Sequence, residues 1–133
     1  MSAKIEGRGA ELLEGKNFCH VATLRADGTV QGAPTWVDLQ NGRPVLNTAE
    51  GRAWPRNLER DPHVTLTVQN MENPYEYVEI RGKVAERTHE GADEHIDALA
   101  KKYLGQDEYP YRQPGEQRVI IRVEPEHVFV QGA

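Results

Sequence analysis

Two tight-turn dipeptides near the start of the chain, Asp27-Gly28 and Asn41-Gly42, constrain its fold more than any other feature of the sequence. Such dipeptides between apolar runs are the strongest local signals for a β-hairpin, because they accept the positive φ angles of a type I′ turn. Three strand-like runs surround these turns, over residues 18–25, 29–39 and 43–49. Strands joined in this way favour an antiparallel sheet over the β-α-β alternation of a Rossmann fold.

Three further strands are predicted in the rest of the chain, over residues 63–69, 75–87 and 117–130. The clearest of them alternates apolar and polar residues, which is the period of a half-buried strand. Gly82 predicts a β-bulge in the long middle strand, and Pro125 predicts a break in the last one. Pro34 lies within the second strand of the chain and cannot donate a ladder hydrogen bond. That strand should therefore lie at a sheet edge or contain a bulge.

Three helices are predicted as well. The first covers residues 9–15 and ends at a glycine. The second begins near Trp54, because Pro55 is tolerated only in a first helical turn, and it ends before Pro62. The third covers residues 89–104, where apolar residues recur at helical spacing and a glycine follows as the C-cap.

These elements describe a mostly β protein of 133 residues, with a single domain over residues 1–133. Strands in direct succession indicate antiparallel pairing, and closure of the sheet into a barrel would remove its exposed edges. The phosphate-binding fingerprints G-x-G-x-x-G and G-x-x-x-x-G-K-[ST] do not occur. We therefore expect a six-stranded antiparallel β-barrel with helices.

The composition argues against several classes of function. The net charge of −5 disfavours a nucleic-acid binder, which is usually basic. No apolar run approaches the roughly 20 residues of a membrane span, and the N-terminus lacks the apolar core of a secretory signal. The single cysteine, Cys19, excludes an internal disulfide, and its apolar surroundings predict a buried, unreactive thiol. We expect a cytoplasmic protein without nucleic-acid or membrane partners.

Residues 47–57 carry the pattern of an anion-binding site. A strand ends in this segment, Gly51 permits a sharp turn, and a helix begins near Pro55. Backbone N–H groups are free at the start of a helix, and Arg52 and Arg56 flank it, so a phosphate would meet both kinds of donor. The alternative is that both arginines are ordinary surface charges beside the acidic residues of the segment.

Side chains able to catalyse a reaction on their own are scarce. None of the five histidines is spaced to share a metal ion with a second histidine or cysteine, and no metal site is predicted. No pair of carboxylates suits acid–base catalysis, and no serine or cysteine stands out as a nucleophile. An enzyme of this sequence would draw its reactivity from a cofactor. Trp36 and Trp54 would either flank a planar ring or pack in the core or at a dimer interface. Tyr75 and Tyr77 share one face of a strand and would either line a pocket or pack beneath the third helix.

Four segments give the chain a resemblance to a known family: PTWVDLQNGRPVLNTAEGR, RNLERDPHVTLTV, NPYEYVEIRGKV and KKYLGQDEYPYRQPGEQRVIIRVEPEHV. The chain resembles the pyridoxamine 5′-phosphate oxidase-like proteins from about Leu13 to its end. More narrowly, it resembles their F420-dependent actinobacterial branch, although these motifs do not separate F420 binders from FMN binders. The resemblance implies a split β-barrel like that of FMN-binding proteins. It also implies a homodimer with two cofactor sites at the subunit interface.

The resemblance further implies which residues hold the cofactor. Two strands would line its ring, and the start of the following helix, with its arginines, would hold its phosphate. The implied residues are Thr35, Trp36, Val37, Asn47, Thr48, Ala49, Arg52, Ala53, Trp54, Arg56, Asn57 and Tyr77. No catalytic residue is implied.

Three hypotheses for the function follow. The first is an F420H2-dependent reductase that transfers a hydride from the reduced deazaflavin to a small organic acceptor, such as an enone or a quinone. The second is an FMN-binding oxidoreductase of the same fold. The third is a non-catalytic carrier of F420 or a flavin, which the missing acid–base pair would suit.

Overall fold

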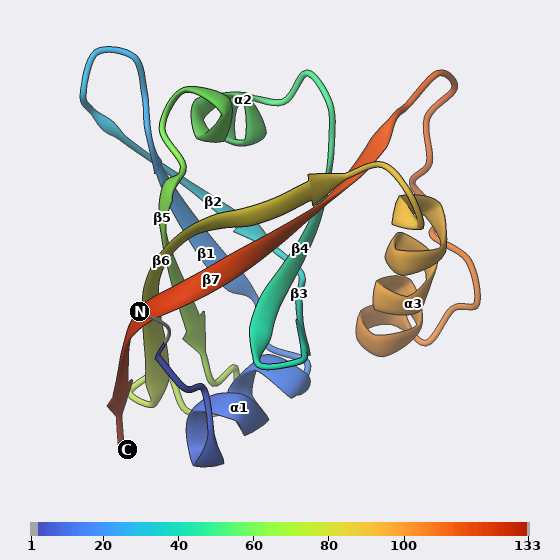
Figure 1. The fold of residues 1–133 in the computed structure, drawn as a ribbon. Coiled ribbons are helices and arrows are strands. Elements are labelled where there is room, and N and C mark those ends of the chain that lie inside the picture. The colour runs from blue at the N-terminus through green and yellow to red at the C-terminus, as the bar shows by residue number, and fades with distance from the viewer. Residues whose placement is uncertain (1–2, 133) are drawn as a thin grey trace.

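The computed structural model describes residues 3–132, which form one antiparallel sheet and three helices (Figure 1). The elements are α1 (Gly7–Glu14), β1 (Cys19–Leu24), β2 (Val30–Thr35), β3 (Val37–Gln40), β4 (Arg43–Ala49), α2 (Ala53–Arg60), β5 (His63–Gln69), β6 (Tyr77–Thr88), α3 (Ala92–Leu104) and β7 (Arg118–Gln131). The strand order is β2-β1-β5-β6-β7-β4-β3, and all neighbours pair antiparallel. None of the helices found within residues 3–132 is long and apolar enough to cross a membrane.

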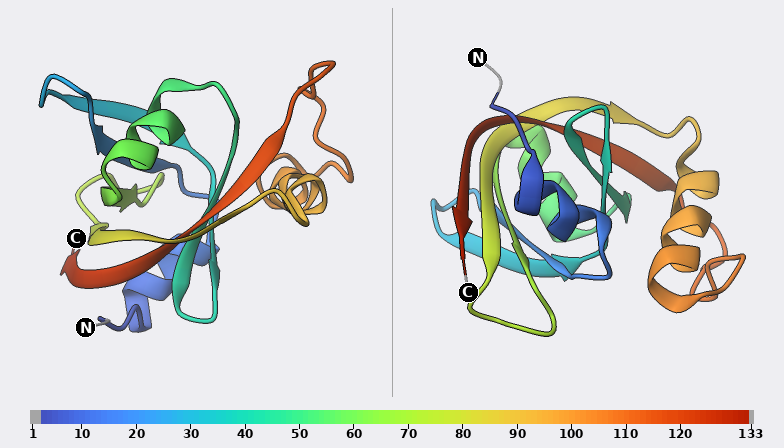
Figure 2. Two further views of the ribbon diagram at one scale, coloured as in Figure 1. Left: turned by 45° about the horizontal axis from the view of Figure 1, so that its top comes forward. Right: turned by 90° about the horizontal axis from the view of Figure 1, so that it is seen from below.

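The chain passes from one edge of the sheet to the other at Trp36. β2 ends at Thr35 and β3 begins at Val37, yet β2 pairs with β1 and β3 pairs with β4, at opposite edges of the sheet. The two edges therefore approach each other at this residue, and the sheet curls into a barrel (Figures 1 and 2). The predicted mostly β, antiparallel barrel with helices is confirmed.

The predicted number of strands is wrong. The run over residues 29–39 was expected to form one strand, but its pairing partner changes from β1 to β4 at Trp36. The described residues therefore form seven strands instead of six. No local sequence signal marks the change, because it depends on which distant strand lies beside each half of the run.

Two helices close the barrel at its two ends, and the core lies between them. In the view from below, α1 lies within the ring of strands with α2 behind it, whereas α3 stands outside (Figure 2, right). α1 contributes Leu12 and Leu13 to the core, and α2 contributes Trp54 and Leu58. Cys19 is also fully buried there, and burial raises the pKa of its thiol, as the prediction of an unreactive cysteine requires.

Proline and glycine lie where the sheet can accept them. Pro34 lies in the edge strand β2, as predicted. Gly82 lies at a shift of register between β6 and β7, as predicted, but the extra residue there, Glu126, belongs to β7 and not to the middle strand. A Cβ at Gly82 would be 2.2 Å from the carbonyl oxygen of Glu124. The predicted break at Pro125 is wrong, because β7 runs on through it. Pro125 stands opposite Gly82, so its missing N–H falls where the ladder is already irregular.

The C-terminal turn of α3 is held against the barrel by polar contacts. The Lys102 ammonium group donates hydrogen bonds to the carbonyl oxygens of Leu13 and Val37, each at 2.7 Å. The Tyr103 hydroxyl donates to the carbonyl oxygen of Asn17 at 2.7 Å and accepts from the Val37 N–H at 3.2 Å. The helix ends at Gly105 in the left-handed conformation, with φ 72°, as expected for its C-cap.

The N-terminal turn of α3 is held by a chain of buried side chains. Arg118 only donates, so the Asn47 carbonyl oxygen faces its Nε at 2.9 Å and the Asn47 amide group faces the other way. That amide group donates to the carbonyl oxygen of Ala92 at 2.9 Å and to Nδ1 of His95 at 3.1 Å. His95 must therefore carry its proton on Nε2, where Asp38 Oδ2 lies 3.9 Å away, too far for a hydrogen bond.

This arrangement keeps His95 neutral. Burial lowers the pKa of His95, and the Arg122 and Arg118 guanidinium groups lower it further against the opposing effect of Asp38. A second proton would also point at the Asn47 amide hydrogens, because Nδ1 is the acceptor of that hydrogen bond. The folded state therefore favours the uncharged imidazole.

We expect the free energy of unfolding to decrease as the pH falls below about 6.5, the ordinary pKa of histidine. In that range the unfolded chain binds a proton that His95 binds less readily in the folded state. The free energy of unfolding should therefore fall by up to about 1.4 kcal/mol per pH unit. Urea denaturation from about pH 8 to 5 should show this decrease. A His95→Gln variant keeps the other histidines and should lack that part of the decrease. The same pH dependence in both proteins would contradict the assignment.

Candidate functional site

A cavity of about 350 Å³ opens where the barrel closes, between the end of β2, α3 and the segment before β7. We call it the Trp36 cleft. Its lining combines aromatic side chains, two arginines and an asparagine. The lining residues are Phe18, Pro34, Thr35, Trp36, Asn47, Arg52, Ile96, Tyr109, Tyr111 and Arg118.

Aromatic rings form one wall of the Trp36 cleft. The half-buried Trp36 ring stacks on Tyr103 with centroids 5.2 Å apart and planes 6° apart. Tyr109 meets Trp36 edge-on at 6.0 Å, and Tyr111 meets Tyr109 edge-on at 5.7 Å. Phe18 stacks on the same Tyr103 ring at 6.0 Å. The stacked Trp36 and Tyr103 rings lie nearly at right angles to Tyr109, so the cleft has aromatic walls in two orientations, which suits a planar ligand.

The polar part of the cleft is fixed by internal contacts. Arg118 is only 4% exposed. It donates to Asn47 through Nε and to Glu116 through Nη1, both at 2.9 Å, and its guanidinium carbon lies 5.1 Å from the centre of the Tyr109 ring. These contacts compensate the burial of its charge. Asn47 and Arg118 are therefore held in place before any ligand arrives.

The start of α2 adjoins the cleft through Arg52. The helix begins at Ala53, one residue before the predicted start, with Pro55 in its first turn and no side chain capping it. Pro55 has no N–H, so the backbone donors without intrahelical partners at this helix start are the N–H groups of Ala53 and Trp54. Within residues 3–132, neither the Arg52 nor the Arg56 side chain has a hydrogen-bond or ion-pair partner, and both are exposed. Free N–H groups and two unpaired guanidinium groups form a surface that favours an anion.

The structure brings part of the predicted site together. Thr35, Trp36, Asn47 and Arg52 line the Trp36 cleft. Ala53 and Arg56 are exposed at the start of α2, beside Arg52. The remaining predicted residues are buried or lie elsewhere, namely Val37, Thr48, Ala49, Trp54, Asn57 and Tyr77.

The buried residues of the predicted set have structural contacts. Trp54 is 6% exposed and belongs to the core, so of the two roles open to it the structure favours packing. Asn57 donates to Thr23 Oγ1 at 3.1 Å and to Gln31 Oε1 at 2.9 Å, which holds α2 on β1 and β2. The Thr48 hydroxyl is buried and has no partner among the described residues. The side chains of Trp54 and Asn57 are therefore unavailable to a ligand in the cleft.

Tyr77 does not join the cleft within this chain. It begins β6, opposite Gln131 at the end of β7, and its ring lies 6.2 Å from that of Phe129. A separate cavity of about 290 Å³ lies beside it. Trp36, by contrast, lies near the segment that precedes β7, at the opposite end of that strand.

Several lining residues were not predicted from the sequence. Tyr109, Tyr111 and Arg118 come from the segment between α3 and β7 or from the first residue of β7, and Phe18 precedes β1. One signal did exist, because Arg118 directly precedes the apolar run Val119-Ile120-Ile121, where a buried arginine requires partners. The path of the segment before it could not be derived, since it depends on where α3 docks.

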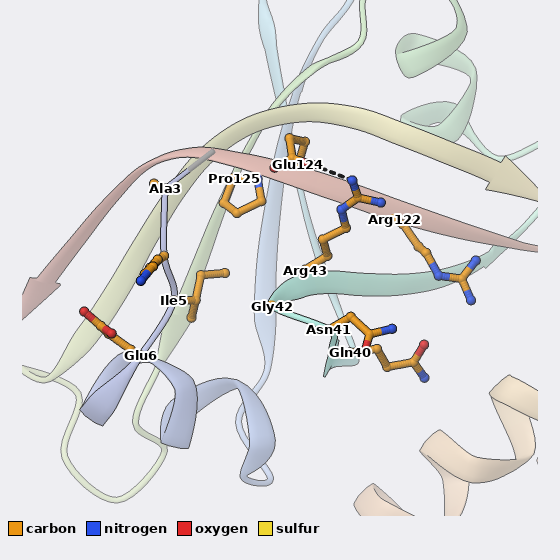
Figure 3. Close-up of a pocket in the computed structure, with 11 residues that line it drawn as sticks. Ala3, Ile5, Glu6, Gln40, Asn41, Gly42, Arg43, Arg122, Glu124 and Pro125 are labelled. Carbon is orange, nitrogen blue, oxygen red and sulfur yellow. Dashed lines mark ion pairs between the residues drawn. The ribbon is translucent and has the colours of Figure 1, made fainter. Parts of the chain in front are cut away.

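A larger cavity of about 490 Å³ lies between the segment before α1, the β3–β4 turn and β7 (Figure 3). The side chain of Arg43 points to Glu124 there, with an ion-pair distance of 2.7 Å. Arg122 is paired with Glu86. Both arginines of this cavity are ion-paired, which leaves Lys4 as its further cationic side chain, so it is a weaker candidate for an anionic ligand than the Trp36 cleft. None of the residues predicted to bind a cofactor lines it.

Comparison with known proteins agrees with this fold. The model of the pyridoxamine 5′-phosphate oxidase family matches residues 5–132. A solved F420 reductase is 30% identical, with a TM-score of 0.78, over 90% of this chain and 94% of that one. None of the curated proteins matches the chain.

Two more distant structures share the fold. A conserved hypothetical protein from Mycobacterium tuberculosis has a TM-score of 0.73 and 18% identity, over 98% of this chain and 86% of its own. A putative pyridoxamine 5′-phosphate oxidase from Listeria innocua has a TM-score of 0.67 and 18% identity, over 90% of this chain and 92% of its own. The family model covers nearly the whole sequence, and the chain therefore belongs to the pyridoxamine 5′-phosphate oxidase family.

Proposed function

We propose that the protein is an F420H2-dependent reductase that acts on a small organic acceptor, such as an enone or a quinone. The observation that carries the proposal is the double position of Arg52, which lines the Trp36 cleft and also stands at the uncapped start of α2. An aromatic cleft that opens onto an anion-binding surface suits a cofactor with a planar ring and a negatively charged tail. The 30% identity to an F420 reductase supports the same choice.

The residues present fit such a cofactor. Arg52, Arg56 and the first N–H groups of α2 would hold the anionic tail, because these donors have no partners within residues 3–132. Thr35, Trp36 and Asn47 would orient the ring. Reduced F420, when bound, supplies a hydride from its ring. The protein's own contribution would be to hold ring and acceptor in contact and to exclude water with its aromatic side chains.

No side chain of the cleft is assigned as a proton donor. Tyr103 lies behind Trp36, but burial raises its pKa to about 12 and its hydroxyl is occupied by backbone partners. His95 is kept neutral, with its Nδ1 engaged by Asn47. We therefore expect the proton that completes the reduction to come from solvent.

We also propose that the protein acts as a cytoplasmic homodimer with the cofactor at the subunit interface. Phe18 and Tyr111, at the cleft, are 41% and 60% exposed, as expected if a second subunit covers them. Sedimentation equilibrium should give twice the chain mass of 15.0 kDa. A single species with the mass of one chain would overturn this part of the proposal.

Cofactor binding and turnover test the function directly. Titration of the protein with F420 and, separately, with FMN should show tight binding of F420, followed by tryptophan fluorescence. Oxidation of F420H2 should then depend on an added enone, quinone or nitroarene. Tight FMN binding without an F420 response would favour the FMN-dependent oxidoreductase. F420 binding without acceptor-dependent oxidation across the whole panel would favour a carrier.

Arg56→Ala should weaken F420 binding by about 1–3 kcal/mol, since a hydrogen bond from a charged donor to a phosphate is lost. The loss should shrink at high salt, because the arginine is exposed. Arg81→Ala is a matched control, because Arg81 is an exposed arginine on β6 that does not line the Trp36 cleft. Unchanged affinity in a folded Arg56→Ala protein would place the anionic tail elsewhere.

A further inference from the structure

Three side chains form an ion-pair cluster at the end of β4, which we call the Glu50 cluster: Glu50, Arg87 and His89. Glu50 is the first residue after β4, and its carboxylate reaches across to the end of β6. One carboxylate oxygen accepts a hydrogen bond from Arg87 Nη2, and the other lies 2.8 Å from His89 Nε2. β7 separates β4 from β6 in the sheet, so these contacts join two strands that do not pair with each other.

Arg87 ties both ends of the segment between β4 and α2. It holds Glu50 at one end, and its Nη1 donates to the carbonyl oxygen of Pro55, in the first turn of α2, at 3.0 Å. Glu59 lies 3.5 Å from the same guanidinium group. Arg52, the residue shared by the cleft and the anion-binding surface, lies between the two tied ends.

Few contacts fix residues 50–52 themselves, although the buried Trp54 anchors the first turn of the helix that follows. Gly51 has a φ of 93°, and nothing lies within 4 Å of the position where its Cβ would be, so the turn is open at this residue. The Arg52 N–H reaches the Ala49 carbonyl oxygen at a long 3.4 Å. The Glu50 N–H makes a normal bond to Gln117 at 2.9 Å, but it holds only the start of the segment. The Arg52 side chain is exposed and has no partner within residues 3–132.

The Glu50 cluster also differs from an ordinary surface ion pair, which contributes little because solvent screens it. Burial alone would raise the pKa of Glu50, but the hydrogen bonds from His89 and Arg87 hold it below its usual value, so the carboxylate is charged. The Arg87 side chain is 23% exposed and binds a carboxylate and a backbone carbonyl at once. Its Nη1 and Nη2 atoms serve these two acceptors separately, which suits the planar fork of an arginine.

We propose that Arg87 is a positioning residue for the cofactor, which holds Glu50 and Pro55 so that Arg52 and the start of α2 face one anionic group. The inference rests on the proposed function, because it concerns the same site. It assigns to Arg87 no contact with the cofactor. Arg87 should therefore affect binding only by positioning Arg52. This role should require the shape of the arginine side chain as well as its charge.

The test is the dissociation constant for F420 in a set of variants. Arg87→Gln should raise it about tenfold, and Arg87→Lys should raise it nearly as much, since lysine keeps the charge but its single nitrogen cannot occupy the positions of both Nη1 and Nη2. Arg52→Gln should also raise it about tenfold. The dissociation constant of the Arg52→Gln/Arg87→Gln double variant should then be only slightly higher than that of either single variant. Two independent effects would instead multiply and raise it about a hundredfold over the natural sequence. If Arg87→Gln fails to fold, Glu50→Gln tests the same cluster, because it removes the charge of Glu50 and leaves the Arg87–Pro55 contact in place.

A second measurement does not depend on the cofactor. Hydrogen exchange of the amides over residues 50–56, in the ligand-free protein, should be faster in Arg87→Gln than in the natural sequence. Arg81→Gln, which alters an exposed arginine of the same strand, should change neither exchange nor affinity. Slower or equal exchange in Arg87→Gln would contradict the proposal.

The outcomes separate the two proposals. If the natural sequence binds F420 and Arg87→Lys restores full affinity, Arg87 acts by charge alone and the positioning role is overturned while the proposed function stands. If the dissociation constant of the double variant rises by the product of the two single effects, the positioning role is overturned in the same way. If the natural sequence binds neither F420 nor FMN, the proposed function falls, and the role of Arg87 in cofactor binding falls with it.

Discussion

Because β2 and β3 pair at opposite edges of the sheet and are joined through Trp36 alone, the barrel must close at that residue. Closure determines where the other features of the site can lie. Trp36 belongs to neither strand, and its ring is free to face α3, where Tyr103 and Tyr109 meet it. The cleft is thus a consequence of the way the sheet closes, and the strands beneath it give it a rigid floor.

The second constraint is the burial of Arg118 beneath the cleft. A buried guanidinium group requires acceptors, and Glu116 and Asn47 supply them. Their geometry then fixes the Asn47 amide, which in turn fixes the tautomer of His95 and the start of α3. One charged side chain therefore orders the polar part of the cleft and attaches the helix that carries its aromatic wall. This explains why the site is ordered although much of it lies outside the barrel.

Local signals predicted the fold well, and distant contacts explain what they missed. The shift of register at Gly82, the edge position of the strand that contains Pro34 and the start of α2 near Pro55 were all predictable. Each of these features depends on backbone conformation within a few residues. The change of partner at Trp36 could not be predicted, since an unbroken strand pattern continues through it. Arg52 could be predicted beside the cleft because a strand end and a helix start are local features, whereas the places of Arg118 and of the tyrosines before it depend on how α3 docks.

The position of α3 outside the barrel has a consequence for how such a protein diversifies. Tyr103, Tyr109 and Tyr111 come from α3 and the segment after it, none of which contributes to the main hydrophobic core. Substitutions or insertions in this region can reshape the mouth of the cleft at little cost to the packing of the strands. The donors at the start of α2 are carried by a helix that does belong to the core. The mouth of the cleft can therefore change over evolutionary time while the start of α2 keeps its position.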